Sequence, residues 1–289
     1  MAVTFTLASG PSTPDEYSTA SISRALSAAL PEGAAFHRVT LLPAFHPETV
    51  IVVQRTESEA VVSMSSFERS WWYYLAEYQS TEADPEPPTI WSEQAAFDAG
   101  ELTELDTAFE DACKSRRAIG LDGVSVLGEA SRGGGKINSF EAWSPRAGDP
   151  ANRFVSSLYD IALERLRSSE VTNRLEQLHG YLDRGLPVKI SGEHPIIYRV
   201  FGSLSSSEEA ELRSSLAAIP THERVVIDMG GFEGMGTILH PVFVEFMQRV
   251  EAVVWVESPS ATMHLSAIRV PKSQRFANLG DAIDHLRQG

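Results

Sequence analysis

The side chains able to do chemistry are scattered along this chain. Its eight histidines lack the His-Glu-x-x-His spacing that binds zinc, and one cysteine, Cys113, cannot build a zinc cluster. No Gly-x-Ser-x-Gly segment marks a nucleophilic serine. Acidic neighbours should raise the pKa of the Cys113 thiol, which we interpret as a packed, unreactive side chain. The sequence therefore predicts no catalytic residue, no metal and no cofactor.

A glycine run before Lys136 raises the possibility of nucleotide binding. A P-loop has two glycines that flank four residues, followed by Lys and then Ser or Thr. Here Ala130 occupies the first glycine position, and Ile137 replaces the hydroxyl residue. The first change removes backbone room for the phosphates, and the second removes the hydroxyl that binds magnesium. The glycine run is therefore interpreted as a hairpin turn.

Composition describes a globular protein. The 289 residues are 43% hydrophobic and 22% charged, which is enough for two domains with cores of their own. No apolar run reaches the roughly 18 residues that span a bilayer, no secretory signal is visible, and a single cysteine fits a reducing compartment. A formal net charge of −15 argues against nucleic acid or an anionic membrane as partner. We expect a cytoplasmic protein.

The negative charge is concentrated in the first two thirds of the chain. Residues 185–289 hold 9 of the 24 Lys and Arg and 12 of the 39 Asp and Glu, which leaves 15 and 27, a net charge of −12, for residues 1–184. The densest stretch, 77–111, holds 11 acidic residues and no Lys or Arg. Such a surface suits a basic partner; the alternative is a solvated face that aids solubility.

Residues 1–184 are predicted to form an acidic α+β domain. Period-two alternation indicates strands at 3–7, 38–42, 50–55, 60–64, 124–127 and 137–143. Helical spacing indicates helices at 18–30, 95–112 and 151–182, with breaks near Gly100 and Ser168. The aromatic segment 67–78 is interpreted as core, with a binding groove as the alternative.

Part of this domain loosely resembles small bacterial proteins of unknown role, including immunity proteins. The resemblance is carried by Gly120-Leu121-Asp122-Gly123, by Trp143-Ser144-Pro145 and by the amphipathic helix that follows. It implies a protein whose acidic surface occludes a basic toxin. The alternative is structural, with Asp122-Gly123 as a turn and Trp143 as a core anchor.

Residues 185–289 alternate strands and helices. Strands are predicted at 195–201, 225–228 and 252–256, and helices at 205–219, 242–250, 260–268 and 279–287. Ser205 and Glu208 have the spacing of a capping box at a helix start. The apolar run Val225-Val226-Ile227 fits a strand buried on both faces, so a sheet covered by helices is expected.

The order of these parts resembles a STAS domain, the module of bacterial anti-sigma-factor antagonists and stress-signalling scaffolds. Within about 187–286, the resemblance rests on an acid-terminated strand at Asp228, a glycine-bearing turn, the helix start Ser258-Pro259-Ser260 and a terminal helix with Ala282-Ile283. It implies an α/β fold with a mixed sheet and helices. It also implies docking to a kinase-like, anti-sigma or other STAS protein rather than catalysis.

Where STAS domains are phosphorylated, an Asp-Ser-Ser-Gly motif starts the central helix. This chain has Gly236-Thr237-Ile238-Leu239 there, so Thr237 matches the modified hydroxyl while Gly236 and Leu239 depart from the motif. The resemblance thus implies a phosphorylation or partner switch at Thr237. Thr237 as a plain helix N-cap is the alternative. The implied partner surface comprises Gly236, Ile238, His240, Ser258 and Ser260.

Three functions follow. The first is a non-enzymatic regulatory or scaffold protein that binds partners through residues 185–289, with residues 1–184 as sensor or adaptor and homo-oligomers allowed. The second is an immunity-type protein that binds a basic toxin through residues 1–184, and this binding should weaken in salt. The third, an enzyme in residues 1–184, has no motif in its favour.

Overall fold

The computed structural model describes residues 3–9, 17–27, 33–55, 59–80, 85–98, 102–114, 123–133 and 135–288. The chain divides into two compact units, 1–183 and 184–289. Each unit has its own hydrophobic core. Among the described helices, none combines the length and the apolar character that crossing a membrane requires.

The first unit is built on a seven-stranded antiparallel sheet. Its strands lie in the order β1-β5-β4-β3-β2-β6-β7. Neighbours in sequence, such as β2 and β3 or β6 and β7, pair directly, as expected from hairpins. The bounds are β1 Val3–Ser9, β2 Ala35–Pro43, β3 Thr49–Arg55, β4 Ala60–Phe67, β5 Thr89–Phe97, β6 Val124–Arg132 and β7 Asn138–Trp143.

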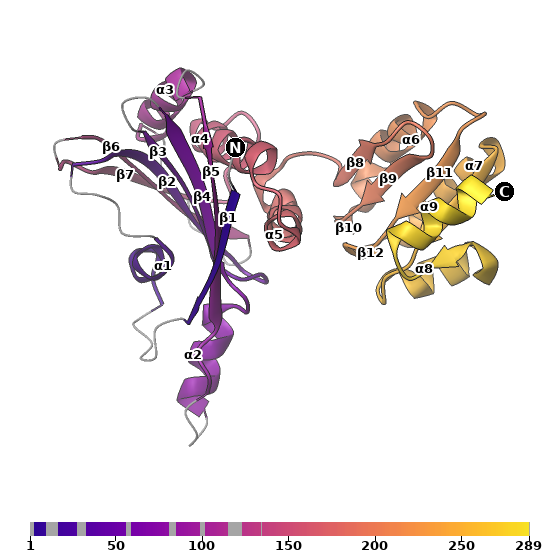
Figure 1. Cartoon of the computed structure of the whole chain (residues 1–289), viewed down its shortest axis with the longest axis horizontal. Helices are drawn as coiled ribbons and strands as arrows, with labels where there is room; N and C mark the ends of the chain where they lie inside the picture. Colours follow the sequence, from indigo (N-terminus) through magenta and orange to yellow (C-terminus); the bar gives the residue numbers. More distant parts are fainter. Residues whose placement is uncertain are drawn as a thin grey trace. The chain divides into compact units, whose positions relative to one another are not determined.

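Helices cover both faces of this sheet. In Figure 1, α1 lies on one side of the sheet, and α4 and α5 lie on the other. The predicted helix 151–182 is divided at the expected place, because α4 ends at Arg165 and α5 begins at Ser169. The bounds are α1 Thr19–Leu26, α2 Trp71–Ser80, α3 Thr103–Ala112, α4 Pro150–Arg165 and α5 Ser169–His179.

The central strands bury side chains on both faces. In β3, Ile51 and Val53 belong to the core beneath α4. Val50 and Val52 belong to a second cluster, with Ile22 of α1. Successive side chains of a strand point to opposite faces, so one apolar strand supplies both cores. A sheet of this kind is stable only when helices are held against each face.

The prediction of helix across 95–112 was wrong in its first part, because β5 runs to Phe97. The alternation Trp91, Ala95, Phe97 is interrupted by Glu93, which is only 1% exposed. A carboxylate at a buried strand position obscured the period-two signal. Its oxygens accept hydrogen bonds from the backbone N–H groups of Arg167 (2.7 Å) and Ser168 (3.0 Å), at the start of α5.

A second buried carboxylate, Glu48, fixes the start of α2 on the opposite face. It has no exposed surface and accepts hydrogen bonds from the backbone N–H groups of Trp71 (2.7 Å) and Trp72 (3.2 Å). The Ser70 hydroxyl donates a third bond of 3.0 Å. Burial, and next the charge of Glu48, raise the pKa of the Tyr17 phenol beside it. The carboxylate thus occupies the positive end of a helix dipole.

The aromatic segment is core on one face only. Trp71 and Tyr74 are buried, whereas Trp72 and Tyr73 are 53% and 58% exposed.

Around Lys136, β6 and β7 pair in the register of a hairpin, as predicted. Residues 56–58, between β3 and β4, lie outside the described residues, as do Gly134 and 120–122.

The second unit has a five-stranded mixed sheet in the order β14-β13-β11-β9-β8. Strands β9, β11, β13 and β14 are parallel, and β8 is antiparallel to β9. A separate parallel pair joins β10 to β12. The bounds are β8 Val188–Ser191, β9 Ile196–Val200, β10 Gly202–Leu204, β11 Arg224–Asp228, β12 Phe232–Met235, β13 Ala252–Val256 and β14 Arg275–Phe276.

Helices cover both faces of this sheet as well. The main core packs α6, α7 and α8 on one face, and a smaller cluster packs α9 against Val226 and Val254 on the other (Figure 1). The expected capping box of Ser205 and Glu208 is present. The chain is therefore a mixed α/β protein with one large antiparallel sheet. The bounds are α6 Glu209–Ala217, α7 His240–Arg249, α8 Ala261–Ala267 and α9 Leu279–Gln288.

We expect Glu48→Gln to lower the free energy of unfolding by about 2 kcal/mol. The amide offers one carbonyl oxygen where the carboxylate served three donors, and a hydrogen bond to a charged group contributes roughly 1.5–3 kcal/mol. Urea denaturation of the full chain measures the change. The control is Glu68→Gln at an exposed position nearby, with an expected effect within about 0.5 kcal/mol. Equal losses in both variants would contradict the role of Glu48.

Candidate functional site

The predicted site residues of the second unit lie beyond the carboxyl ends of its parallel strands. Asp228, the last residue of β11, is 3% exposed. Its carboxylate accepts a hydrogen bond from the backbone N–H of Gly230 (2.9 Å) and pairs with Arg199 of β9 at 3.4 Å. The acid that ends the strand therefore closes the following turn and is not presented to a partner.

The segment that matches the phosphorylation motif only at Thr237 forms a turn of 3-10 helix, Thr237–Leu239. This turn leads directly into α7. Leu239 is fully buried, which holds the turn against the core. Thr237 is exposed, and Ile238 is 55% exposed. The cap is Gly236, so the interpretation of Thr237 as N-cap does not hold. A Cβ atom at position 236 would overlap the Ser206 hydroxyl, which suits glycine at this position.

A pair of histidines joins this turn to α8. His240, the first residue of α7, has its Nε2 atom 2.9 Å from Nδ1 of His264. His264 is buried, and its ring lies edge-on to Phe232. Burial, and next the neighbouring His264, lower the pKa of the half-buried His240. The pair fixes the start of α7 beside the middle of α8.

The two predicted serines have different places. Ser260 is exposed before α8. Ser258 is 7% exposed; its hydroxyl bonds the Phe232 carbonyl (3.3 Å) and accepts from the Ala261 N–H (3.2 Å). The expectation that Ser258 forms part of a partner surface is therefore corrected, because its buried hydroxyl bonds Phe232 and the first residue of α8 inside the unit.

Two residues of this region were missed from the sequence. His264 is the ring partner of His240, and Met263 on the same helix is 69% exposed. The sequence Thr-Met-His-Leu does not indicate that His264 contacts His240, 24 residues earlier. Nor does it indicate that Met263 faces solvent. We name the exposed side chains Thr237, Ile238, Ser260 and Met263 the switch surface.

The chemistry available at the switch surface is modification of a hydroxyl. Among the described residues, no group of three or more His, Cys, Asp or Glu side chains could hold a metal ion. A helix start has N–H groups without intrahelical partners and a positive dipole end, so a phosphate on Thr237 would be stabilised there. Phosphorylation would also add close to two negative charges.

Cys113 is exposed, so its interpretation as a packed thiol was wrong. It borders a hollow of about 510 Å³ with His37, whose Nε2 atom lies 3.0 Å from Asp106. Partial burial, and then Glu110, raise the pKa of the thiol, as the sequence suggested. Burial lowers the pKa of His37 despite Asp106. Thiol and imidazole are therefore both neutral at neutral pH, which does not favour a nucleophile.

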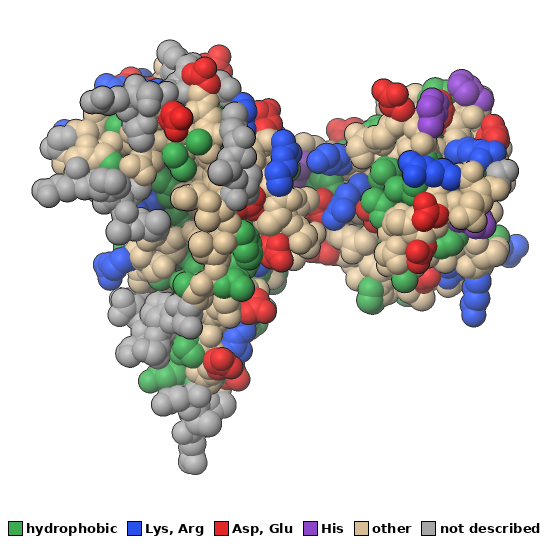
Figure 2. Space-filling model, viewed as in Figure 1, with side chains coloured by type: hydrophobic (Ala, Val, Ile, Leu, Met, Phe, Trp, Pro, Cys, Tyr) green, Lys and Arg blue, Asp and Glu red, His purple; other side chains and the backbone are tan. Residues whose placement is uncertain are grey.

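Several described acidic residues of 77–111 are paired within the first unit, whereas Glu82, Asp84 and Glu101 lie outside the described residues. Asp106 contacts His37 and lies 3.8 Å from Arg55, and Glu93 is buried. In Figure 2, acidic and basic side chains are interspersed on the face of this unit that is shown. The remaining described ion pairs of the stretch are Glu77 with Arg69, Glu110 with Arg132, and Asp111 with Lys114 and Arg153. These pairs place basic side chains among the described carboxylates of the stretch.

No family model and no curated protein matches this sequence. Part of the chain is similar to the anti-sigma factor antagonist SpoIIAA in its unphosphorylated form, with 16% identity, a TM-score of 0.29, and 35% of this chain and 97% of that one covered. A DUF3478 protein with a SpoIIAA-like fold from Shewanella loihica has 18% identity, a TM-score of 0.27, and 35% and 94% covered. A structure named Mglu has 15% identity, a TM-score of 0.22, and 46% and 33% covered. These low scores assign no activity.

Replacing His264 with Phe should raise the pKa of His240, because a second imidazole then no longer adds positive charge beside it. Burial persists, so the pKa stays below about 6.5. NMR titration of the His240 ring in both proteins measures the shift. The control is His222→Phe at an exposed position, which should leave the titration of His240 unchanged.

The lowered pKa of His240 also makes the stability of the folded protein depend on pH. The pKa of His240 is lower in the folded than in the unfolded chain, so the unfolded chain binds more protons as the pH falls below about 6.5. The wild-type protein should lose stability in that window, and His264→Phe should lose less. An unchanged His240 pKa in that variant would contradict the coupling of the two rings.

Proposed function

We propose that this chain is a regulatory or scaffold protein, and that residues 184–289 dock a protein partner through the switch surface. The observation that supports it is the combination of exposure and rigidity at one helix start. Thr237 and Ile238 face solvent, while Leu239 beneath them is fully buried. A partner would find these side chains already ordered, so binding would cost little conformational entropy.

The histidine pair extends this surface to a second helix. His240 holds α7 against His264 of α8, and α8 exposes Met263. Exposed apolar side chains from two segments provide contact area, and methionine adapts its shape to different partners. A docking role of this kind requires neither catalysis nor a cofactor.

Charge on Thr237 would act as the switch. A phosphate there would be favoured by the helix start but would place two negative charges beside Ile238, against which an apolar partner surface must pack. Docking and modification would therefore exclude each other. The resemblance of the sequence to STAS domains makes a kinase-like ATPase, an anti-sigma protein or another STAS protein the first partners to test.

We expect Thr237→Glu to weaken partner binding about tenfold, because a buried unpaired carboxylate costs at least 1–2 kcal/mol. Thr237→Ala should bind within about twofold, since it adds no charge and shortens an exposed side chain. Capture from a lysate of the source cells by each full-length variant, followed by titration calorimetry with the purified partner, measures both effects.

The matched control is Thr221→Glu, an exposed threonine ahead of the amino end of β11. It adds the same charge to the same unit and should leave binding unchanged. Ile238→Ser should weaken binding without adding charge. Equal binding by wild-type, Thr237→Glu and Ile238→Ser proteins would reject the switch surface.

A further inference from the structure

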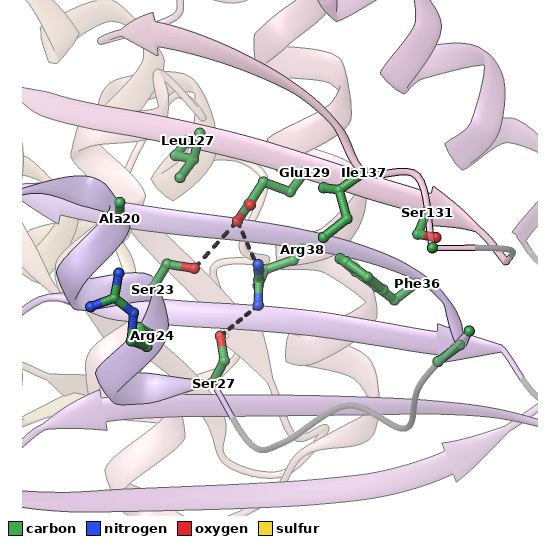
Figure 3. A pocket seen from close by; sticks show the side chains of 13 residues that line it. Ala20, Ser23, Arg24, Ser27, Phe36, Arg38, Leu127, Glu129, Ser131 and Ile137 are labelled. Atoms are coloured by element: carbon green, nitrogen blue, oxygen red, sulfur yellow. Dashed lines mark hydrogen bonds and ion pairs between the residues drawn. The ribbon is translucent and has the colours of Figure 1, made fainter.

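A cavity of about 610 Å³ lies in the first unit, between α1 and the sheet. Its floor is formed by β2 and β6, and α1 forms a wall (Figure 3). Small-molecule sites in proteins have volumes of roughly 300–1,000 Å³. The cavity side of α1 presents residues three or four positions apart, which share one face of a helix: Ala20, Ser23, Arg24 and Ser27.

An ion pair occupies the floor. Arg38 of β2 and Glu129 of β6 are direct cross-strand partners. Arg38 Nε donates to Glu129 Oε2 at 2.8 Å, and the two side chains are only 14% and 15% exposed. Serines of α1 extend the pair, because Ser23 donates to the same carboxylate oxygen (3.3 Å) and Arg38 Nη1 donates to Ser27 (3.0 Å). In Figure 3, two of these bonds meet at the Glu129 carboxylate, and the third links Arg38 to Ser27.

The pair uses only part of its hydrogen-bonding capacity. A guanidinium has five N–H donors and a carboxylate accepts at both oxygens. Within the described residues, Arg38 Nη2 and Glu129 Oε1 have no hydrogen-bond partner. Neither atom is among the fully enclosed ones without a partner, and both residues line the cavity. Because the two groups are joined through Nε and Oε2, one ion pair keeps a charged donor and a charged acceptor open.

Apart from Arg24 and Ser131, the side chains that complete the lining are apolar. Phe36 and Leu127 are buried at 6% and 9% exposure on the floor, and Ile137 at the rim is 52% exposed. The central carbon of the Arg38 guanidinium lies over the Phe36 ring, 5.3 Å from its centroid, a cation–π contact that favours this position on the floor. Arg24 at the rim already has an interaction of its own. A ligand would thus contact apolar side chains around one polar edge.

The charges of the floor restrict what can bind. A carboxylate or phosphate would approach Glu129, and an ammonium group would approach Arg38, so the balanced pair disfavours a charged ligand. A carbonyl oxygen beside an N–H group matches both open atoms at once, with the carbonyl accepting from Arg38 and the N–H donating to Glu129. We propose that this cavity binds a small, neutral heterocycle with a lactam edge, of the nucleobase kind.

The test uses the full-length protein with hypoxanthine as probe, which has a lactam edge, and caffeine as matched control. Caffeine is a purine of greater apolar area whose amide nitrogens carry methyl groups, so it cannot donate to Glu129. Ligand-observed NMR and titration calorimetry should show hypoxanthine binding and caffeine binding about tenfold or more weakly, because a hydrogen bond to a charged group is lost. Benzoate and benzamidine test anions and cations of similar size.

Glu129→Gln should weaken hypoxanthine binding about tenfold, whereas Glu104→Gln, at an exposed position on α3, should leave it unchanged. Circular dichroism checks the fold of each variant. Should Glu129→Gln fail to fold, Ile137→Ser at the exposed rim serves in its place and should weaken binding several-fold. Equal binding of hypoxanthine and caffeine, preference for a charged probe, or no binding at millimolar concentration would overturn the proposal.

Discussion

The central strands of the first unit bury side chains on both faces, so helices must be held against each face of the sheet. Two buried glutamates perform this task in the same way. Glu48 accepts the backbone N–H groups at the start of α2, and Glu93 accepts those at the start of α5. A buried carboxylate is costly alone, but a helix start offers unpaired donors and a positive dipole end. Each glutamate therefore fixes where a helix begins.

The helix that forms the cavity is held differently. Ile22 and Leu26 of α1 are buried in the second cluster of the sheet, with Phe36 and Val50. Because these apolar residues carry the packing, the neighbouring face of α1 is free to present small polar side chains. The Arg38–Glu129 pair lies beneath that face, where it is shielded from water but incompletely bonded. Small-molecule sites typically contain a few polar groups of this kind, which are shielded from water and still able to form hydrogen bonds with a ligand.

The second unit follows a related rule with a different result. Leu239 and the His240–His264 bond hold the start of α7 in place, and Thr237 and Ile238, which precede these anchors, are exposed. The proposed docking surface and the proposed ligand cavity lie in separate units and depend on different residues. Each experiment can therefore fail without affecting the other, and success of both would give a chain that senses a small molecule and binds a protein.

The sequence by itself determined most elements, because apolar periodicity reports which faces a segment must bury. The helix break at Ser168, the hairpin around Lys136 and the alternation of the second unit were read from it. It failed at β5, where buried Glu93 obscured the alternation. The tertiary structure alone decided that Ser258 is buried, that His240 meets His264 and that Arg38 faces Glu129. Such contacts join residues distant in sequence, and periodicity carries no information about which faces meet.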